Sequence, residues 1–254
     1  MQHSTTNNAI DYQLVQPAPE LSHFVDSFWS LSNTSSEAKP VIILPDGRID
    51  ASFSFGEARN IGLLGLESGP SRGEITAGTT MFSISFKPLA VEYLFKDYLP
   101  IVPDSAALLP ANYFGVTIDE FVGMQQFCTL LSGKILAMVT EEIDERKKNL
   151  FDLIYASHGS ITVKELSEKV FWSTRQINRY FQDIIGISPK AYCNILRFKS
   201  SFQHIKDGKL FPEENYSDQS HFIREIKKYA GVVPKELARN KNDRFIQFST
   251  LPPK

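Results

Sequence analysis

The first third of the chain alternates apolar and polar residues in short runs, a pattern typical of β-strands. The segment VIILPDGRIDASFSF (41–55) has a run rich in β-branched residues, a Pro-Asp-Gly turn, and then an apolar residue at every second position. In the turn, Pro45 presets φ and Gly47 accepts the positive φ that other residues resist. Two further runs, NIGLLGLESG (60–69) and TTMFSISFK (79–87), predict strands around a Gly/Ser/Pro-rich stretch at 67–73.

The aromatic residues of this region have two interpretations, a ligand pocket or a hydrophobic core. Alternation puts Phe53 and Phe55 on one face of a strand, which favours the core. No ligand-binding residue is therefore assigned. The aromatic residues in question are Trp29, Phe53, Phe55, Phe82, Phe86 and Tyr93.

After Lys87 the period becomes helical. The segment PLAVEYLFKDYL (88–99) predicts a short helix with Pro88 at its first turn. A second helical region begins near Asp119 and carries an apolar stripe that either packs on the β-region or pairs with a second chain, as in a coiled coil. The stripe consists of Phe121, Met124, Cys128, Leu131, Ile135 and Met138.

From residue 149 onward the chain shows helical periodicity and an internal repeat. RYFQDIIGISPK (179–190) and REIKKYAGVVPK (224–235) share Arg, Gly, Pro and Lys at the same places, offset by 45 residues. Ser173 and Ser217 are predicted N-caps of the two repeated helices, and Gly186 and Gly231 are predicted to end them. Each copy thus predicts a helix with a polar, Arg-bearing face, as in a helix-turn-helix.

The segment between the two copies predicts a linker. Ser188 is a suitable N-cap, and a helix from Pro189 to Lys206 would be about 27 Å long. Such a rod would hold two recognition helices about one DNA turn (~34 Å) apart on one face of a duplex.

These motifs resemble the DNA-binding domain of AraC-type (AraC/XylS family) bacterial transcription regulators over residues 150–240. The strongest match is YSDQSHFIREIKKYAGVVPKEL (216–237), and TRQINRYFQDIIGISPKAY (174–192) matches the first motif. The N-terminal part is similar to a sensor-like domain of such regulators through FVDSFWSL, ILPDGRIDASFSF, LLGLE and FSISFKPLAVEYLF.

The resemblance implies an α+β protein with three parts. Residues 1–115 would form a mostly β sensor or dimerisation-like domain, 116–148 a helical connector, and 149–254 an all-α domain with two helix-turn-helix motifs joined by a linker helix, followed by a tail. The implied function is that of a cytoplasmic bacterial transcription factor which binds specific DNA sequences. Its expected partners are double-stranded DNA, a small-molecule effector, RNA polymerase and a second copy of the chain, with no membrane.

This sequence departs from the family pattern in the second motif and in one turn. The second motif is about four residues short, and the loss falls on its supporting helix, where only LFPEEN (210–215) remains. The second recognition helix is therefore expected to be less firmly held or tilted. Asn215 and Phe171 stand where the family often has Gly, and Asn tolerates positive φ better than Phe.

The residues expected to meet DNA follow from the helix-turn-helix, in which the N-terminal part of the second helix reaches base edges. The alternative for each arginine is a solvated side chain or an ion pair with Asp183 or Glu225. The predicted base contacts are Thr174, Arg175, Asn178 and Arg179 in the first motif, and Gln219, Ser220 and Arg224 in the second. The predicted phosphate contacts are Ser173, Lys190, Ser217 and Lys235.

Charge and composition narrow the possible partners and classes of protein. Residues 1–140 hold seven Lys and Arg against fourteen Asp and Glu, whereas residues 141–254 hold twenty against fifteen, which suits a polyanionic partner for the second half. Two cysteines 65 residues apart argue against a disulfide scaffold or a zinc finger. Neither a signal peptide nor a transmembrane segment is predicted.

No enzyme, cofactor or metal site is expected, because no catalytic or phosphate-binding motif is present. Two other functions stay open: a helical interaction protein that has lost DNA binding, and a small-molecule enzyme in the N-terminal domain.

Overall fold

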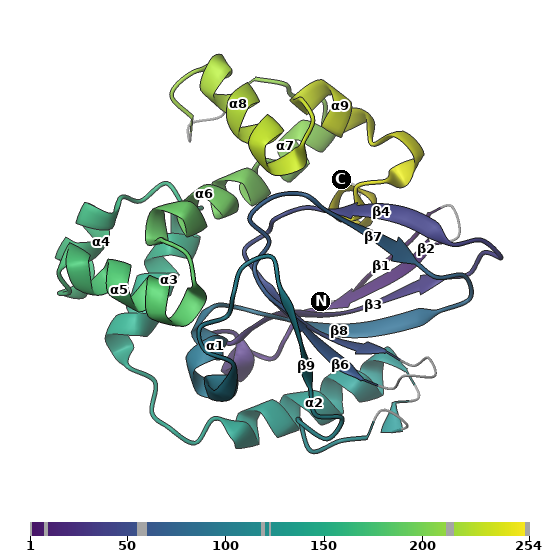
Figure 1. Cartoon of the computed structure of the whole chain (residues 1–254), viewed down its shortest axis with the longest axis horizontal. Coiled ribbons are helices and arrows are strands. Elements are labelled where there is room, and N and C mark those ends of the chain that lie inside the picture. Colours follow the sequence, from purple (N-terminus) through teal and green to yellow (C-terminus); the bar gives the residue numbers. More distant parts are fainter. Residues whose placement is uncertain are drawn as a thin grey trace.

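The computed structural model describes residues 2–7, 10–54, 60–117, 120–121, 123–211 and 216–251. A β-sheet region is followed by a helical region, so the predicted α+β class is confirmed (Figure 1). Phe55, Asp119 and Asn215, for which the sequence made predictions, lie outside the described residues.

The larger sheet has seven antiparallel strands in the order β1-β2-β3-β8-β5-β6-β9. Its strands are β1 (Gln2–Asn7), β2 (Ile10–Val15), β3 (Val25–Asn33), β5 (Ile49–Ser54), β6 (Ile61–Leu64), β8 (Thr80–Phe86) and β9 (Ala106–Leu109). Short 3-10 turns lie at Pro19–Leu21, Lys96–Tyr98 and Lys241–Asp243.

A second, two-stranded sheet consists of β4 (Lys39–Ile43) and β7 (Ser71–Ile75). The strand β7 begins inside the Gly/Ser/Pro-rich stretch at 67–73, which the sequence pattern placed between two strands. The prediction of no strand there was wrong for residues 71–73. Five residue pairs with β4 hold the strand extended, and this pairing outweighs local propensity. The turn between β4 and β5 crosses from one sheet to the other, and Gly47 adopts the predicted positive φ of 76°.

One face of the seven-stranded sheet is covered by α1 (Leu89–Leu94) and α2 (Met124–Met138). The ring of Phe127 on α2 lies 5.2 Å from the rings of Phe53 and Phe82 and 6.1 Å from that of Phe28. Phe53 and Phe86 are fully buried, so the core interpretation is confirmed for them.

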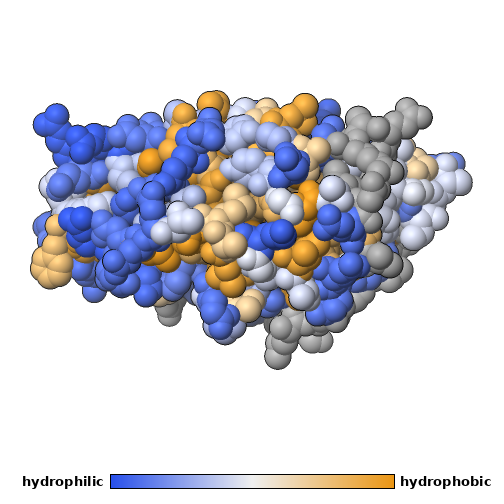
Figure 2. Space-filling view, turned by 90° about the horizontal axis from the view of Figure 1, so that it is seen from below, coloured by the Kyte–Doolittle hydropathy of each residue, from blue (hydrophilic) through white to orange (hydrophobic). Residues whose placement is uncertain are grey.

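The apolar stripe of α2 packs on the sheet. The alternative prediction, in which this stripe pairs with a second chain, is wrong. The helix begins at Met124 rather than near Asp119. Figure 2 shows the face that carries α2, where apolar side chains gather in the middle and hydrophilic ones at the end formed by α3 to α5. A homodimer would have to use a surface other than the buried stripe.

The helical region confirms most of the predicted helix ends. Ser173 and Ser188 cap their helices by accepting the backbone N–H groups of Gln176 and Ala191, and Gly186 and Gly231 end theirs with positive φ. Its helices are α3 (Glu145–Ala156), α4 (Val163–Val170), α5 (Thr174–Ile185), α6 (Pro189–Ser200), α7 (Phe202–Lys206), α8 (Gln219–Ala230), α9 (Pro234–Arg239) and α10 (Ile246–Thr250).

Two predictions about this region were wrong. The linker is two helices, α6 and α7, which meet at Ser201, whose backbone N–H and buried hydroxyl both donate to the carbonyl of Phe198, at 3.0 and 2.6 Å. The cap of α8 is Asp218, whose carboxylate accepts the His221 N–H at 2.8 Å, while the Ser217 hydroxyl lies 3.2 Å from the His221 ring. A charged acceptor at the helix N-terminus outcompetes the hydroxyl.

A continuous apolar core joins the sheet region to the first half of the helical region. It runs from strand residues such as Ile49 to Phe181 on α5 and Tyr192 on α6. The Tyr192 hydroxyl donates to the Gly47 carbonyl at 3.1 Å, so α6 is tied directly to the turn between the two sheets. The predicted boundaries at 115 and 148 stay predictions.

Candidate nucleic-acid interface and interdomain pocket

The first predicted recognition helix, α5, presents a polar face from its first residue. Its N-terminus is fixed by a reciprocal capping arrangement in which Ser173 and Gln176 satisfy each other's backbone N–H groups. Ile177 and Phe181 are buried on the opposite face. The predicted base contacts Thr174, Arg175, Asn178 and Arg179 are all exposed.

The second predicted recognition helix, α8, has the same two-faced form. Phe222 and Ile226 are buried in a core shared with α6, and Arg224 is exposed between them. Gln219 and Ser220 lie exposed in the first turn. The structure thus gives each motif one exposed arginine in register, Arg179 and Arg224, and neither forms an ion pair within the described part of the chain.

The predicted phosphate contacts also occupy matching places. Lys190 and Lys235 are the second residues of α6 and α9, directly after the Pro that begins each helix, and both are exposed. Ser173 and Ser217 are exposed before α5 and α8. No contact with DNA is tested by these positions alone.

The turn of the first motif contains Phe171 in a left-handed conformation, with φ of 55° and 89% of the residue exposed. A Phe in this region carries backbone strain that Gly would not. The turn thus has a left-handed residue at the position where Gly would be the least strained. Nothing in the structure explains why Phe stands there.

The supporting helix of the second motif is absent from the described residues between α7 and α8. The core of this motif is closed by other parts of the chain: Leu44, just after β4, is fully buried in it, as are Phe245 and Phe248 near the C-terminus. Sequence reasoning missed this role, although the apolar run at 245–248 was a usable signal.

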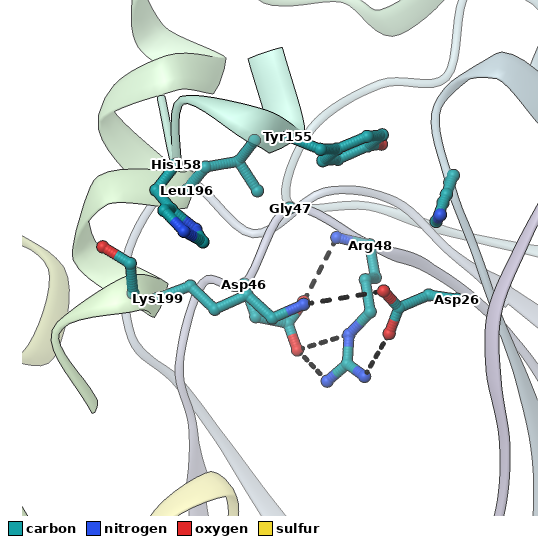
Figure 3. Close-up of a pocket in the computed structure, with 10 residues that line it drawn as sticks. Asp26, Asp46, Gly47, Arg48, Tyr155, His158, Leu196 and Lys199 are labelled. Atoms are coloured by element: carbon teal, nitrogen blue, oxygen red, sulfur yellow. Dashed lines mark hydrogen bonds and ion pairs between the residues drawn. The ribbon is translucent and has the colours of Figure 1, made fainter. Parts of the chain in front are cut away.

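A pocket of about 380 Å³ lies where the sheet region meets the helical region (Figure 3). The turn after β4 and the start of β3 form one wall, and α3 and α6 form the other. Its lining residues are Asp26, Asp46, Gly47, Arg48, Lys87, Tyr155, His158, Leu196, Lys199 and Ser200.

The floor of this pocket is a network of charges centred on Arg48. Its guanidinium donates to Asp46, with Nε to Oδ2 at 2.7 Å, and to Asp26 at 3.2 Å. Lys199 of α6 reaches the same Asp26 at 3.9 Å, which makes an ion pair between the two regions. Burial alone would raise the pKa of Asp26, but Lys199, Arg48 and Lys87 outweigh it and lower that pKa to about 2.

Lys87 is the cation in the pocket without a carboxylate of its own. Its ammonium donates to the carbonyl of Ser22 at 2.6 Å and lies 5.0 Å from the centre of the Tyr155 ring. Burial lowers the pKa of Lys87. The three cations Lys87, Arg48 and Lys199 face two carboxylates, so the lining has one positive charge in excess.

Two further carboxyl groups, those of Asp50 and Glu67, interact electrostatically with Arg48. Burial, with Asp46 nearby, raises the pKa of Asp50 to about 6 and that of Glu67 to about 9. The Ser85 hydroxyl donates to Asp50 at 2.5 Å and accepts the Trp29 indole N–H at 3.0 Å. Trp29 thus belongs to a polar face of the sheet rather than to the apolar core.

No group of three or more His, Cys, Asp or Glu side chains in the described residues is placed to hold a metal ion. Cys128 and Cys193 are both buried, and burial raises the pKa of each thiol. None of the described helices is both long and apolar enough to span a lipid bilayer.

Comparison with known proteins finds a match in the N-terminal region. A family described as "Domain of unknown function (DUF6597)" matches residues 13–101. No curated protein matches the chain.

Solved structures with a similar arrangement include ToxT from Vibrio cholerae. The structure from strain O395 has 13% identity and a TM-score of 0.39, over 91% of this chain and 98% of that one. A 1.65 Å structure of ToxT in its P21 form has 14% identity and a TM-score of 0.40, over 90% and 97%. A likeness of this size assigns neither a ligand nor a function to the chain.

Proposed function

We propose that this protein is an AraC-type transcription regulator that binds specific sequences of double-stranded DNA through α5 and α8. The observation that carries the proposal is the pair of capped helices, each with a buried apolar face and an exposed arginine in register, at Arg179 and Arg224. Helices of this form read base edges from the major groove. The excess of Lys and Arg in the second half supports the same partner.

The proposal assigns no catalytic role to any residue. The ion pair of Lys199 with Asp26 joins the helical region to the sheet region across the charged pocket. An interaction protein that keeps the helical fold without binding DNA is the competing function, and the shortened second motif is what favours it.

A substitution of Lys190 tests the electrostatic contribution to DNA binding. The exposed Lys190 ammonium follows Pro189 at the start of α6, and as a phosphate contact it adds affinity without reading sequence. Lys190→Ala is expected to weaken binding to every duplex alike and to flatten the slope of log affinity against log salt by about one unit.

Fluorescence anisotropy of full-length protein with labelled duplexes at several salt concentrations measures this slope. Lys134→Ala is a suitable control, because this partly exposed lysine lies on α2, which covers the seven-stranded sheet. A slope that changes equally in both variants, or in neither, would remove Lys190 from the interface.

We further propose that the interdomain pocket holds a small anionic effector, either a carboxylate or a phosphate. The positive excess of its lining matches one negative charge, and Lys87 forms no direct ion pair among the residues that the structure describes, although Asp26 and Asp152 act on it from farther away. Because Lys87 comes from the sheet region and Lys199 from α6, an anion between them would bind both regions at once.

Thermal unfolding at constant ionic strength in sodium phosphate, sodium acetate and sodium chloride tests this pocket. An anion that binds only the folded protein raises its Tm in proportion to occupancy. We expect phosphate or acetate to raise the Tm of the wild type and of Lys190→Gln above the chloride value, and to leave Lys87→Gln unchanged. Equal Tm values in all three salts would contradict the proposal.

A further inference from the structure

The two helix-turn-helix motifs are docked on different parts of the N-terminal region. The first motif is held by α1 and the loop that follows it. Glu92 of α1 accepts a hydrogen bond from the Tyr180 hydroxyl at 3.1 Å and pairs with Lys147. Gly186 packs so closely on this loop that a Cβ there would lie 2.5 Å from the Ile101 carbonyl oxygen.

The second motif is held by the two-stranded sheet. Leu44, which follows β4, inserts its side chain into the core formed by Phe198, Phe222 and Ile226. Gly231, which ends α8, lies against Pro70 just before β7, where an added Cβ would be 3.4 Å from the proline ring. Both strands of the small sheet therefore lead directly into this motif.

Residues 240–251 form the C-terminal segment. This segment makes a second connection between the small sheet and the second motif. The Ile42 N–H donates to the Arg244 carbonyl at 2.6 Å, and Ile42 forms a parallel bridge with Phe245. Gln247 makes two bonds with the Leu44 backbone: its Oε1 accepts the N–H at 3.0 Å, and its Nε2 donates to the carbonyl at 2.9 Å.

The other side of the C-terminal segment is fixed to α7. The rings of Phe202 and Phe248 lie 5.2 Å apart, and the Lys206 ammonium donates to the carbonyls of Phe248 and Leu251 at 3.0 and 2.8 Å. Helix α7 in turn packs on α9, which packs on α8. The segment thus packs against the second motif and links it to the edge of β4.

We infer that the small sheet, the C-terminal segment and the second motif form one mechanical unit, so that the position of the small sheet sets the orientation of α8 relative to α5. Within the described residues the small sheet shares no strand pairing with the seven-stranded sheet that supports the first motif. A displacement of one sheet against the other would therefore change the geometry of the two recognition helices. The effect on DNA binding rests on the proposed function. The existence of the mechanical unit does not depend on that function.

Hydrogen exchange of the full-length protein tests the unit without DNA. Gln247→Ala removes both bonds to Leu44, and each such bond corresponds to roughly a fivefold change in a local opening equilibrium. We expect exchange in β4, α8 and α9 to accelerate by roughly tenfold or more, with α3 and α5 unchanged. Lys206→Met, which removes the two bonds to the C-terminal segment from the other side, is expected to give the same pattern.

Gln182→Ala is the matched control, because Gln182 is an exposed glutamine on α5. Acceleration confined to β4, or acceleration of α5 to the same extent as α8, would overturn the inference. In DNA footprints Gln247→Ala is expected to weaken protection of one half-site more than the other. Absence of DNA binding by the wild type would refute the proposed function. The hydrogen-exchange result would still show whether the mechanical unit exists.

Discussion

Asp46→Asn is expected to lower the free energy of unfolding by about 3 kcal/mol, because it leaves the buried Arg48 charge without its main partner. Asp46 is 5% exposed, and both of its oxygens are used: Oδ1 accepts the Arg48 backbone N–H at 3.1 Å and Oδ2 accepts from the guanidinium. Asparagine keeps the shape of the side chain and loses its charge. Urea unfolding at pH 8, followed by tryptophan fluorescence, measures the difference.

Asp50→Asn is the matched control for this experiment, since it makes the same substitution in the same cluster. Burial raises the pKa of Asp50 to about 6, so the folded protein gains stability from this group at low pH and loses it as pH rises from about 4 through 6. At pH 8 Asp50→Asn should therefore leave stability unchanged or raise it. If Asp46→Asn cost no more than Asp50→Asn at pH 8, Arg48 would not depend on Asp46.

Arg179→Ala is expected to weaken specific DNA binding by roughly 10- to 100-fold, equivalent to about 1–3 kcal/mol, and to relax base preference at one position. Arg179 lies on the exposed face of α5, two turns from the capped N-terminus. The planar guanidinium pairs with O6 and N7 of guanine together, which alanine cannot do. Competition by duplexes changed at single base pairs locates the position affected.

Arg72→Ala provides the control, because it makes the same substitution at an exposed arginine of β7, outside both recognition helices. Arg224→Ala in α8 should relax preference at a different position. Unchanged affinity and unchanged preference in Arg179→Ala would show that the recognition face has been placed on the wrong side of α5.

The sequence predicted those features that depend on nearby residues. The caps Ser173 and Ser188 and the terminal glycines Gly186 and Gly231 follow from local hydrogen bonding and from φ, and the structure confirms them. Asp218 rather than Ser217 is the cap of α8, because the helix begins at Gln219, one residue later than the sequence predicted.

The bond of Gln247 to Leu44, the pairing of β7 and the burial of Asp46 depend on distant residues and left no local signal. Gln247 and Leu44 are 203 positions apart, and nothing about a glutamine near the C-terminus indicates a bond to a strand end. The stretch containing β7 is extended only because β4 lies beside it. Asp46 and Arg48 have the sequence of an ordinary turn, and the burial of Asp46 follows from the packing of α6 over that turn.

The central claim is that the two motifs read DNA sequence, and one measurement tests it most directly. Full-length protein is titrated against the DNA upstream of its own gene and against a scrambled duplex of equal length, by fluorescence anisotropy at several salt concentrations. We predict tighter binding to the upstream duplex, with affinity for both falling steeply as salt rises. No binding to either duplex at low salt would contradict the claim and favour an interaction protein that has kept the helical fold.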